Sequence, residues 1–137
     1  TEQRNGLMVD RLALTDEEGG EGEFLGGKGI NLDYRVMQND WWLTMAYVRS
    51  EKGPWGLDGG LDGTTNYVVV QKADGSTQRY SSCTALPLQK NDVVKVVTAS
   101  GGGYGNPANR SSDQVKEDIK NGYISAERAL EVYGVEA

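Results

Sequence analysis

The sequence contains no histidine and only one cysteine, Cys83, among its 137 residues. Without histidine, the chain lacks the side chain that most often acts as a catalytic base near neutral pH and as a zinc ligand. A single cysteine excludes an intrachain disulfide bond and a cysteine-based metal cluster. With no histidine to activate it, Cys83 is also a poor candidate for a nucleophile. These absences exclude several common kinds of catalytic site.

Basic residues and long apolar runs are also scarce. Lysine and arginine together number 14 against 20 aspartate and glutamate residues, which gives a net charge of −6. Nucleic-acid binding needs a surplus of basic side chains, so we do not expect a nucleic-acid partner. No apolar run reaches the length of a membrane span, and the polar residues 1–5 do not resemble a signal peptide. Together with the single cysteine, this favours a cytoplasmic protein.

Large aliphatic and phenylalanine side chains are few, whereas glycine is abundant. Leucine, isoleucine, valine and phenylalanine make up 28 of the 137 residues, and glycine makes up 19. The first share lies near the ~20% level below which chains tend to stay disordered, and glycine is about twice its usual share. The length fits a single domain. We therefore expect a thin core, long loops and stabilisation by docking onto a larger protein.

Alternating and β-branched stretches predict a chain that consists mainly of strands. The predicted strands are residues 7–14, 30–36, 42–48, 65–71, 77–80 and 93–97. We expect the second and third of these to form a hairpin around the turn at Asn39-Asp40. The pair Asp74-Gly75 is typical of a type I′ hairpin turn, in which both central residues have positive φ.

Two short helices are predicted after residue 110. Ser111 and Gln114 form a capping box, Asn121-Gly122 provides a stop, and Ser125 caps the second helix. Residues at helical spacing predict the buried stripe of that helix. They are Ala126, Ala129, Leu130 and Tyr133.

The predicted fold class is α+β, mainly β: a small antiparallel β barrel or sandwich with a C-terminal pair of short α-helices. Residues 1–110 form a β-rich domain with glycine-rich loops. Residues 111–137 form a helical tail packed on that domain or on a partner, and the whole is expected to be one structural unit.

Two loops resemble ligand-binding motifs incompletely. Residues 22–28 match the first seven positions of the phosphate-binding loop, but Gly29 stands where a serine or threonine hydroxyl would bind Mg²⁺. The acidic residues at 16–23 would repel a triphosphate, and they lack the ligand spacing of a calcium-binding loop. A surface loop is the favoured interpretation, with a self-sufficient nucleotide binder as the alternative.

The glycine-rich loops also carry aromatic residues that could anchor a partner. Trp55 is either a plug over the domain's own core or an interface hot spot. The glycines at 101–105 permit positive φ or close backbone approach, either to another chain or within an internal turn. The candidate interface residues are Trp55, Gly56, Gly101, Gly102, Gly103, Tyr104, Gly105 and Tyr133. No catalytic, cofactor-binding or metal-binding residue is assigned, because nothing brings a nucleophile, a base and an oxyanion site together.

Five segments occur in an order that resembles one known family. They are GGEGEFLGGKG (19–29), PWGLDGG (54–60), LQKNDVV (88–94), GGGYGNP (101–107), and DIKNGYISAERA with VYG (118–129 and 132–134). In this order they resemble the C-terminal part of hydantoinase B/oxoprolinase proteins. The chain departs from that family in having Leu25 and Lys28 where arginine is usual. It also departs in length, since it resembles only the last quarter of an ordinary member.

The resemblance implies a role within a larger enzyme. A stand-alone chain of this kind is similar to the small β subunit of enzymes of the acetophenone and acetone carboxylase type, which convert a ketone, bicarbonate and ATP into a β-keto acid. It implies a non-catalytic structural subunit that completes the fold of a hydantoinase-B-like large subunit. Larger hydantoinase A-like and B-like subunits would be the partners, and ATP with Mg²⁺ or Mn²⁺ would bind to them. The alternative is a C-terminal fragment or subunit of an ATP-dependent hydantoinase or oxoprolinase that hydrolyses cyclic amides.

Overall fold

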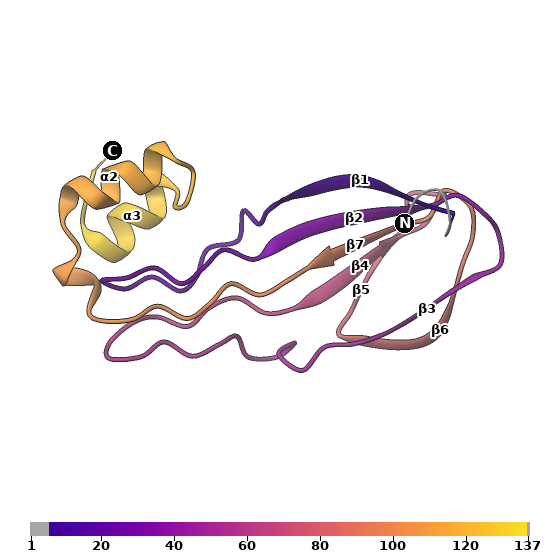
Figure 1. The fold of residues 1–137 in the computed structure, drawn as a ribbon, viewed down its shortest axis with the longest axis horizontal. Helices are drawn as coiled ribbons and strands as arrows, with labels where there is room; N and C mark the ends of the chain where they lie inside the picture. The colour runs from indigo at the N-terminus through magenta and orange to yellow at the C-terminus, as the bar shows by residue number, and fades with distance from the viewer. Residues whose placement is uncertain (1–5, 137) are drawn as a thin grey trace. The chain divides into compact units, whose positions relative to one another are not determined.

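The computed structural model describes residues 6–136, which belong to two compact units that alternate along the chain (Figure 1). The strand unit comprises residues up to 15, residues 30–50 and residues 66–98. The loop-and-helix unit comprises residues 16–29, 51–65 and 99 onward. The sequence suggested a boundary at residue 110. In the structure, two earlier glycine-rich loops cluster with the helices instead.

The strand unit is built from two antiparallel sheets. Its strands are β1 (Leu7–Leu14), β2 (Ile30–Val36), β3 (Trp41–Ala46), β4 (Tyr67–Gln71), β5 (Thr77–Tyr80), β6 (Ser82–Leu88) and β7 (Val93–Val97). One sheet has the order β1-β2-β7-β4-β5, and β3 pairs with β6 in the other. The larger sheet is open at β1 and β5, so the unit is sandwich-like rather than a barrel. The predicted α+β, mainly β class is confirmed.

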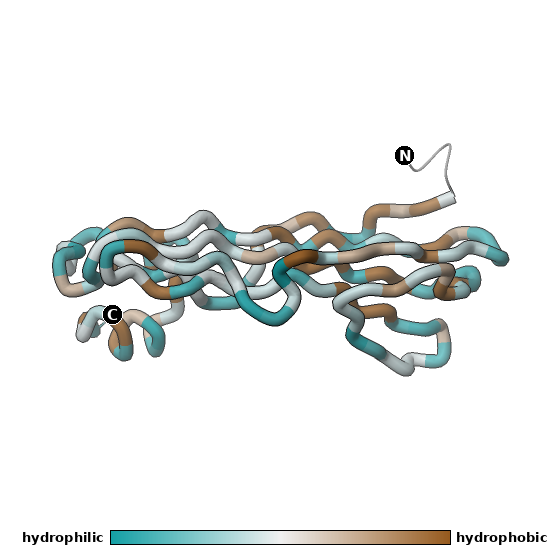
Figure 2. The backbone as a smooth tube through the Cα atoms, turned by 90° about the horizontal axis from the view of Figure 1, so that it is seen from below, coloured by the Kyte–Doolittle hydropathy of each residue, from teal (hydrophilic) through white to brown (hydrophobic). Residues whose placement is uncertain are grey.

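A small valine-rich core lies between the two sheets. Its fully buried members Val68 and Val70 alternate along β4 with half-buried residues, as expected for a strand that packs one face on a core. Figure 2 shows the hydrophobic and hydrophilic residues along the backbone. Half-buried side chains of β3 and β6, including Trp41 and Leu86, cover this cluster from the second sheet. Each buried aliphatic side chain contributes about 1.5–3 kcal/mol relative to exposure.

A bulge in β1 keeps the apolar residues of that strand on one face. The register of β1 against β2 shifts between Val9 and Arg11, so Asp10 is the extra residue. Val9 lies opposite Tyr34, whereas Leu12 lies opposite Leu32. Because directly opposed residues share a face, the bulge places the apolar residues before and after it on the core side of the sheet.

The predicted strands are confirmed, with bounds that differ by no more than two residues, but one predicted pairing is wrong. The strands at 30–36 and 42–48 do not form a hairpin: β2 pairs with β1 and β7, and β3 pairs with β6. Strand β6 was not predicted from the sequence. This strand contains Pro87, and Ala85 has a φ of 50°, so its pattern is irregular. Pairing with β6 takes β3 into the second layer, where its apolar face covers the core.

The hairpin of β4 and β5 is confirmed, but its turn is not type I′. Only Gly75 in the turn has positive φ (89°). The Gly75 amide donates to the Lys72 carbonyl (2.9 Å), and the Lys72 amide donates to the Ser76 carbonyl (2.8 Å). This is a type I turn followed by a glycine bulge, since a single left-handed residue is enough when the loop is one residue longer.

Asp92 ties the start of β7 to this turn. Its buried carboxylate accepts hydrogen bonds from the Lys72 ammonium (2.9 Å), the Ala73 amide (3.0 Å) and the Gln89 amide (2.9 Å). Burial alone would raise the pKa of Asp92, but these hydrogen bonds outweigh it and lower the pKa below its usual value. The carboxylate is therefore held in its charged form.

The loop-and-helix unit ends in a 3₁₀ turn, η1 (Pro107–Asn109), and two helices, α2 (Ser112–Lys120) and α3 (Ala126–Tyr133). The capping box at Ser111 and the N-cap at Ser125 are confirmed. Val115 and Ala129 are fully buried in a small core shared by the helices. Leu130 was predicted to be buried but is 52% exposed, because it lies 100° around the helix from Ala129. In the part of the chain that the structure describes, no helix is long and apolar enough to cross a membrane.

Candidate partner interface

Three glycine-rich segments of the loop-and-helix unit are joined by backbone hydrogen bonds. We call residues 19–27, 53–63 and 101–105 the glycine platform. The Gly103 amide donates to the Leu61 carbonyl (2.9 Å), and the Leu57 amide donates to the Gly103 carbonyl (2.9 Å). Residues 101–105 are thereby bonded to residues 53–63.

The close approach of these segments requires glycine at particular positions. A Cβ atom on Gly103 would lie 2.2 Å from the Glu21 carbonyl oxygen, and one on Gly102 would lie 2.1 Å from the Trp55 carbonyl oxygen. Real Cβ atoms do not approach other atoms this closely. Of the two interpretations of the 101–105 loop, the structure places these two glycines against backbone of the same chain.

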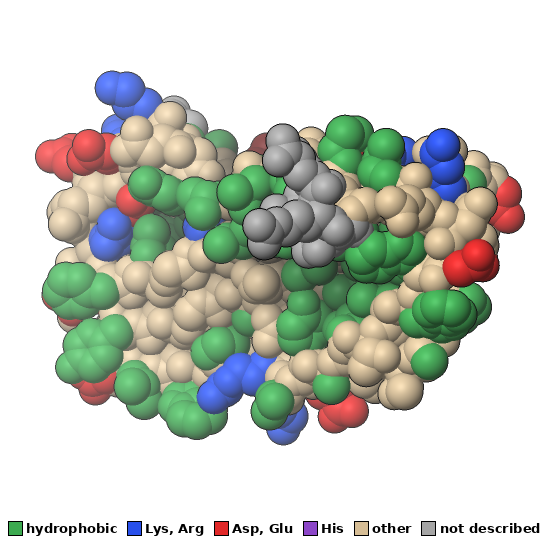
Figure 3. Space-filling view, turned by 45° about the vertical axis from the view of Figure 1, so that its right-hand side comes forward, with side chains coloured by type: hydrophobic (Ala, Val, Ile, Leu, Met, Phe, Trp, Pro, Cys, Tyr) green, Lys and Arg blue, Asp and Glu red, His purple; other side chains and the backbone are tan. Residues whose placement is uncertain are grey.

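The platform carries large apolar side chains that remain exposed. Tyr104 forms bridges with Phe24 and with Leu57, and the Phe24 and Tyr104 ring centroids lie 6.3 Å apart. We call Phe24, Leu57 and Tyr104 the apolar patch; each is more than half exposed. Trp55, on the same segment as Leu57, is 64% exposed. Exposed hydrophobic side chains also stand out in the space-filling view (Figure 3). Adjacent exposed apolar side chains of this size are typical of interaction surfaces.

The other predicted interface residues have different surroundings. A Cβ on Gly56 would lie 2.1 Å from the Gly60 carbonyl oxygen, so Gly56 too packs within the platform. Gly101 is half-buried, and Gly105 is buried with a φ of 78°. The exposed residues Phe24 and Leu57 were not among the predicted interface residues. The signal that singled out Trp55, a large apolar residue among glycines, also applies to them.

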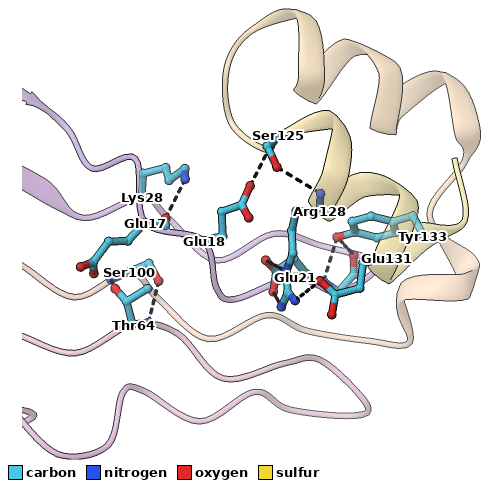
Figure 4. Close-up of polar contacts among 11 residues, drawn as sticks. Glu17, Glu18, Glu21, Lys28, Thr64, Ser100, Ser125, Arg128, Glu131 and Tyr133 are labelled. Atoms are coloured by element: carbon cyan, nitrogen blue, oxygen red, sulfur yellow. Dashed lines mark hydrogen bonds and ion pairs between the residues drawn. The ribbon is translucent and has the colours of Figure 1, made fainter. Parts of the chain in front are cut away.

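Tyr133 fastens α3 to the platform (Figure 4). Its hydroxyl donates to the Gly22 carbonyl (3.0 Å) and accepts from the Gly22 amide (3.1 Å). Burial raises the pKa of the Tyr133 hydroxyl. Both hydrogen bonds of this predicted interface residue are therefore made to its own chain.

Arg128 provides a second attachment of α3. Its guanidinium binds both carboxylate oxygens of the buried Glu21 (3.0 and 3.1 Å) and also contacts Glu131 (2.8 Å) (Figure 4). The hydrogen bonds that the guanidinium donates to Glu21 raise the pKa of Arg128. Bidentate pairing is the strong geometry for such contacts.

The acidic loop and the incomplete phosphate-loop motif are both engaged in internal contacts. Glu18 accepts a hydrogen bond from the Ser125 amide (2.8 Å), and the Lys28 ammonium donates to the Glu17 carbonyl (2.9 Å) (Figure 4). The loop leads into β2 rather than into a helix, so it lacks the structural context of a phosphate-binding loop. Between residues 6 and 136, no three side chains of the usual metal-binding types cluster.

Comparisons with known proteins identify one family. The family model described as hydantoinase B/oxoprolinase matches residues 1–107. The beta subunit of the caprolactamase of Pseudomonas jessenii is 31% identical over 94% of this chain and 23% of its own length. The B subunit of a putative D-/L-hydantoinase of Pseudomonas sp. strain NS671 is 30% identical over 94% and 22%, respectively.

Solved structures give the same result. The ATP-dependent caprolactamase of Pseudomonas jessenii matches all of this chain with a TM-score of 0.82 and 26% identity, over 24% of its own chain. The nucleotide-free acetone carboxylase matches 94% of this chain with a TM-score of 0.75 over 21% of its own chain. At 20% identity, that second likeness concerns the fold alone. The present chain thus spans less than a quarter of the relatives it matches.

Proposed function

The chain belongs to the hydantoinase B/oxoprolinase family, and we propose that it is a non-catalytic structural subunit of a multi-subunit ATP-dependent enzyme in the cytoplasm. In this role it completes the fold of a larger hydantoinase-B-like subunit. One observation carries the proposal: the whole chain superimposes on about a quarter of a caprolactamase chain, at a TM-score of 0.82. The same fold in that relative is one part of a much longer polypeptide.

The exposed side chains of the glycine platform support a docking role. Trp55 and Tyr104 are exposed and belong to the aromatic residue types that are enriched among interface hot spots. We propose Trp55 and Tyr104 as the main contacts with the larger subunit. The half-buried Tyr133 acts indirectly, by holding α3 against the platform.

We propose that the complete enzyme carboxylates a ketone, using bicarbonate and ATP, in the manner of the acetophenone and acetone carboxylases. Acetone carboxylase contains the same fold, so the fold is compatible with this reaction. Hydantoinase A-like and B-like subunits are the partners, and they bind ATP with Mg²⁺ or Mn²⁺. The second candidate is ATP-dependent hydrolysis of a cyclic amide. It is favoured by sequence identities of 31% and 30% to subunits of a caprolactamase and a hydantoinase.

Reconstitution tests the structural role and the reaction together. The chain is co-expressed with the hydantoinase A-like and B-like subunits of its own source, and the purified complex is assayed with ATP. Incorporation of labelled bicarbonate into acetophenone or acetone supports the carboxylase, whereas ring opening of caprolactam or a hydantoin supports the second candidate. A chain that elutes alone near 15 kDa, without a larger subunit, would contradict the structural role.

The Trp55→Ala variant tests the docking surface. Loss of a buried aromatic hot spot weakens association by about 2 kcal/mol or more, equivalent to at least about 30-fold in Kd. Trp42→Ala is the matched control, because Trp42 is exposed to a similar extent (63%) but lies on β3 of the strand unit. If both variants and the wild type bind the larger subunit with equal affinity, Trp55 is not part of the interface.

A further inference from the structure

One end of the core-side face of the large sheet is exposed. Ile30 and Leu32 alternate along β2 with polar residues and lie on the same face as the buried Val36. Leu14 pairs with Ile30, and Leu12 pairs with Leu32. Leu12 is 68% exposed, and Leu14 and Ile30 are each more than 40% exposed. We call Leu12, Leu14 and Ile30 the open face.

The open face is exposed because the second sheet is smaller than the first. Between residues 6 and 136, only β3 and β6 lie in that second layer, opposite a sheet of five strands. Leu7 and Tyr34, toward the other end of the two strands, pack on the core cluster, whereas Leu12, Leu14 and Ile30 are exposed. The second layer therefore covers the core face at one end of β1 and β2 and leaves the other end open.

The pattern of residues indicates a face built for burial. On the opposite side of the same strands lie charged residues, including Asp33 and Arg35. The bulge at Asp10 places Leu12 and Leu14 on the apolar side; without it, they would point to the charged side. Scattered single apolar residues are normal on a surface, but a contiguous group on two paired strands is not.

We propose that an apolar segment of the larger hydantoinase-B-like subunit covers the open face and completes the second layer of the sandwich. This inference rests on the proposed function. Its support is that the fold occupies less than a quarter of each relative it matches, so most of the family polypeptide lies outside the present chain. A second copy of the chain is a poorer occupant, because each copy carries a net charge of −6.

The test compares two lysine substitutions on opposite faces of β1. Leu12→Lys places a charge on the open face. Met8→Lys places the same charge on the other face of the same strand, where Met8 pairs with Arg35 and is 40% exposed. Calorimetry measures the affinity of each purified variant for the separately purified hydantoinase-B-like subunit. Sedimentation measures the oligomeric state of each variant alone. We expect Leu12→Lys to weaken binding at least about 30-fold, and Met8→Lys to change it less than about 3-fold.

The remaining outcomes separate the two proposals. If the wild type binds the larger subunit and Leu12→Lys binds equally well, the open face is not part of the interface, although the structural role stands. If the wild type does not bind, the proposed function fails and this inference fails with it. If the wild type alone dimerises and Leu12→Lys does not, a second copy covers the face and the inference is wrong.

Hydrogen exchange provides a measurement that needs no variant. In the wild-type complex, the amides at residues 12–14 should exchange more slowly than in the free chain, because a covered strand excludes water. Unchanged exchange at these amides in a complex that has formed would overturn the inference, even if Leu12→Lys failed to fold.

Discussion

The close backbone approach at Gly103 in the glycine platform predicts a large effect for Gly103→Ala. The added Cβ atom would lie 2.2 Å from the Glu21 carbonyl oxygen, whereas ordinary van der Waals contacts begin at 3.4 Å. The two segments must therefore separate by more than 1 Å. The obstacle is backbone rather than the flexible end of a side chain, so a rotamer change cannot relieve it.

The magnitude follows from the contacts that this separation breaks. Across these two segments, the Phe24 amide donates to the Tyr104 carbonyl (2.9 Å) and the Tyr104 amide donates to the Phe24 carbonyl (3.0 Å). Each lost bond costs about 1 kcal/mol, and the residual overpacking costs about 1–3 kcal/mol. We expect Gly103→Ala to lower the free energy of unfolding by about 3–5 kcal/mol.

Urea unfolding followed by the helical circular dichroism signal measures this change, because α2 and α3 both belong to the loop-and-helix unit. Gly27→Ala is the control, since a Cβ atom on Gly27 meets nothing within 4 Å. Gly27→Ala should leave the free energy of unfolding unchanged or raise it by up to about 1 kcal/mol, because alanine lowers the conformational entropy of the unfolded chain. If the two variants unfold within about 0.5 kcal/mol of each other, the close approach of the segments is refuted.

Three further substitutions test other contacts through the free energy of unfolding. Asp92→Asn should cost about 2 kcal/mol, since it removes a buried charge from its hydrogen bonds. Folding lowers the pKa of Asp92, so the difference in unfolding free energy between wild type and Asp92→Asn should be fully present above about pH 4. It should shrink as the pH falls through the folded-state pKa. A difference that does not depend on pH would contradict this account of Asp92. Tyr133→Phe should cost about 1–2 kcal/mol by removing both hydrogen bonds to Gly22, and an unchanged value would mean that α3 is held by other contacts. Ser111→Ala should cost about 1 kcal/mol as a lost N-cap, against almost nothing for Ser112→Ala; equal effects would argue against the cap.

Local patterns predicted most of the elements correctly. The alternation in residues 30–36 specified β2 to the residue, and the cap at Ser111 correctly specified the start of α2. Such signals depend only on neighbouring residues, whose spacing decides which face is apolar and which backbone groups need partners. The glycine at position 75 likewise marked the turn between β4 and β5 correctly.

Long-range pairing and exposure could not be predicted from these patterns. The hairpin of β2 and β3 was a reasonable expectation for consecutive strands, but β3 pairs with a strand about 40 residues later. Leu130 has the spacing of a buried residue, yet the burial of its helix is centred on Ala129. Phe24 and Leu57 flank Tyr104 only because separate loops meet, and sequence spacing does not encode that meeting.

In the glycine platform, the groups that hold the surface together differ from the groups it displays. Main-chain atoms join the segments, whereas Phe24, Leu57 and Tyr104 project side chains that are more than half exposed. Mutations at these three positions can therefore change which partner surface the platform binds without disturbing the backbone hydrogen bonds that join its segments. Natural variation should follow the same rule, with glycine fixed at the crossings and the projecting groups changing only together with the surface that they contact.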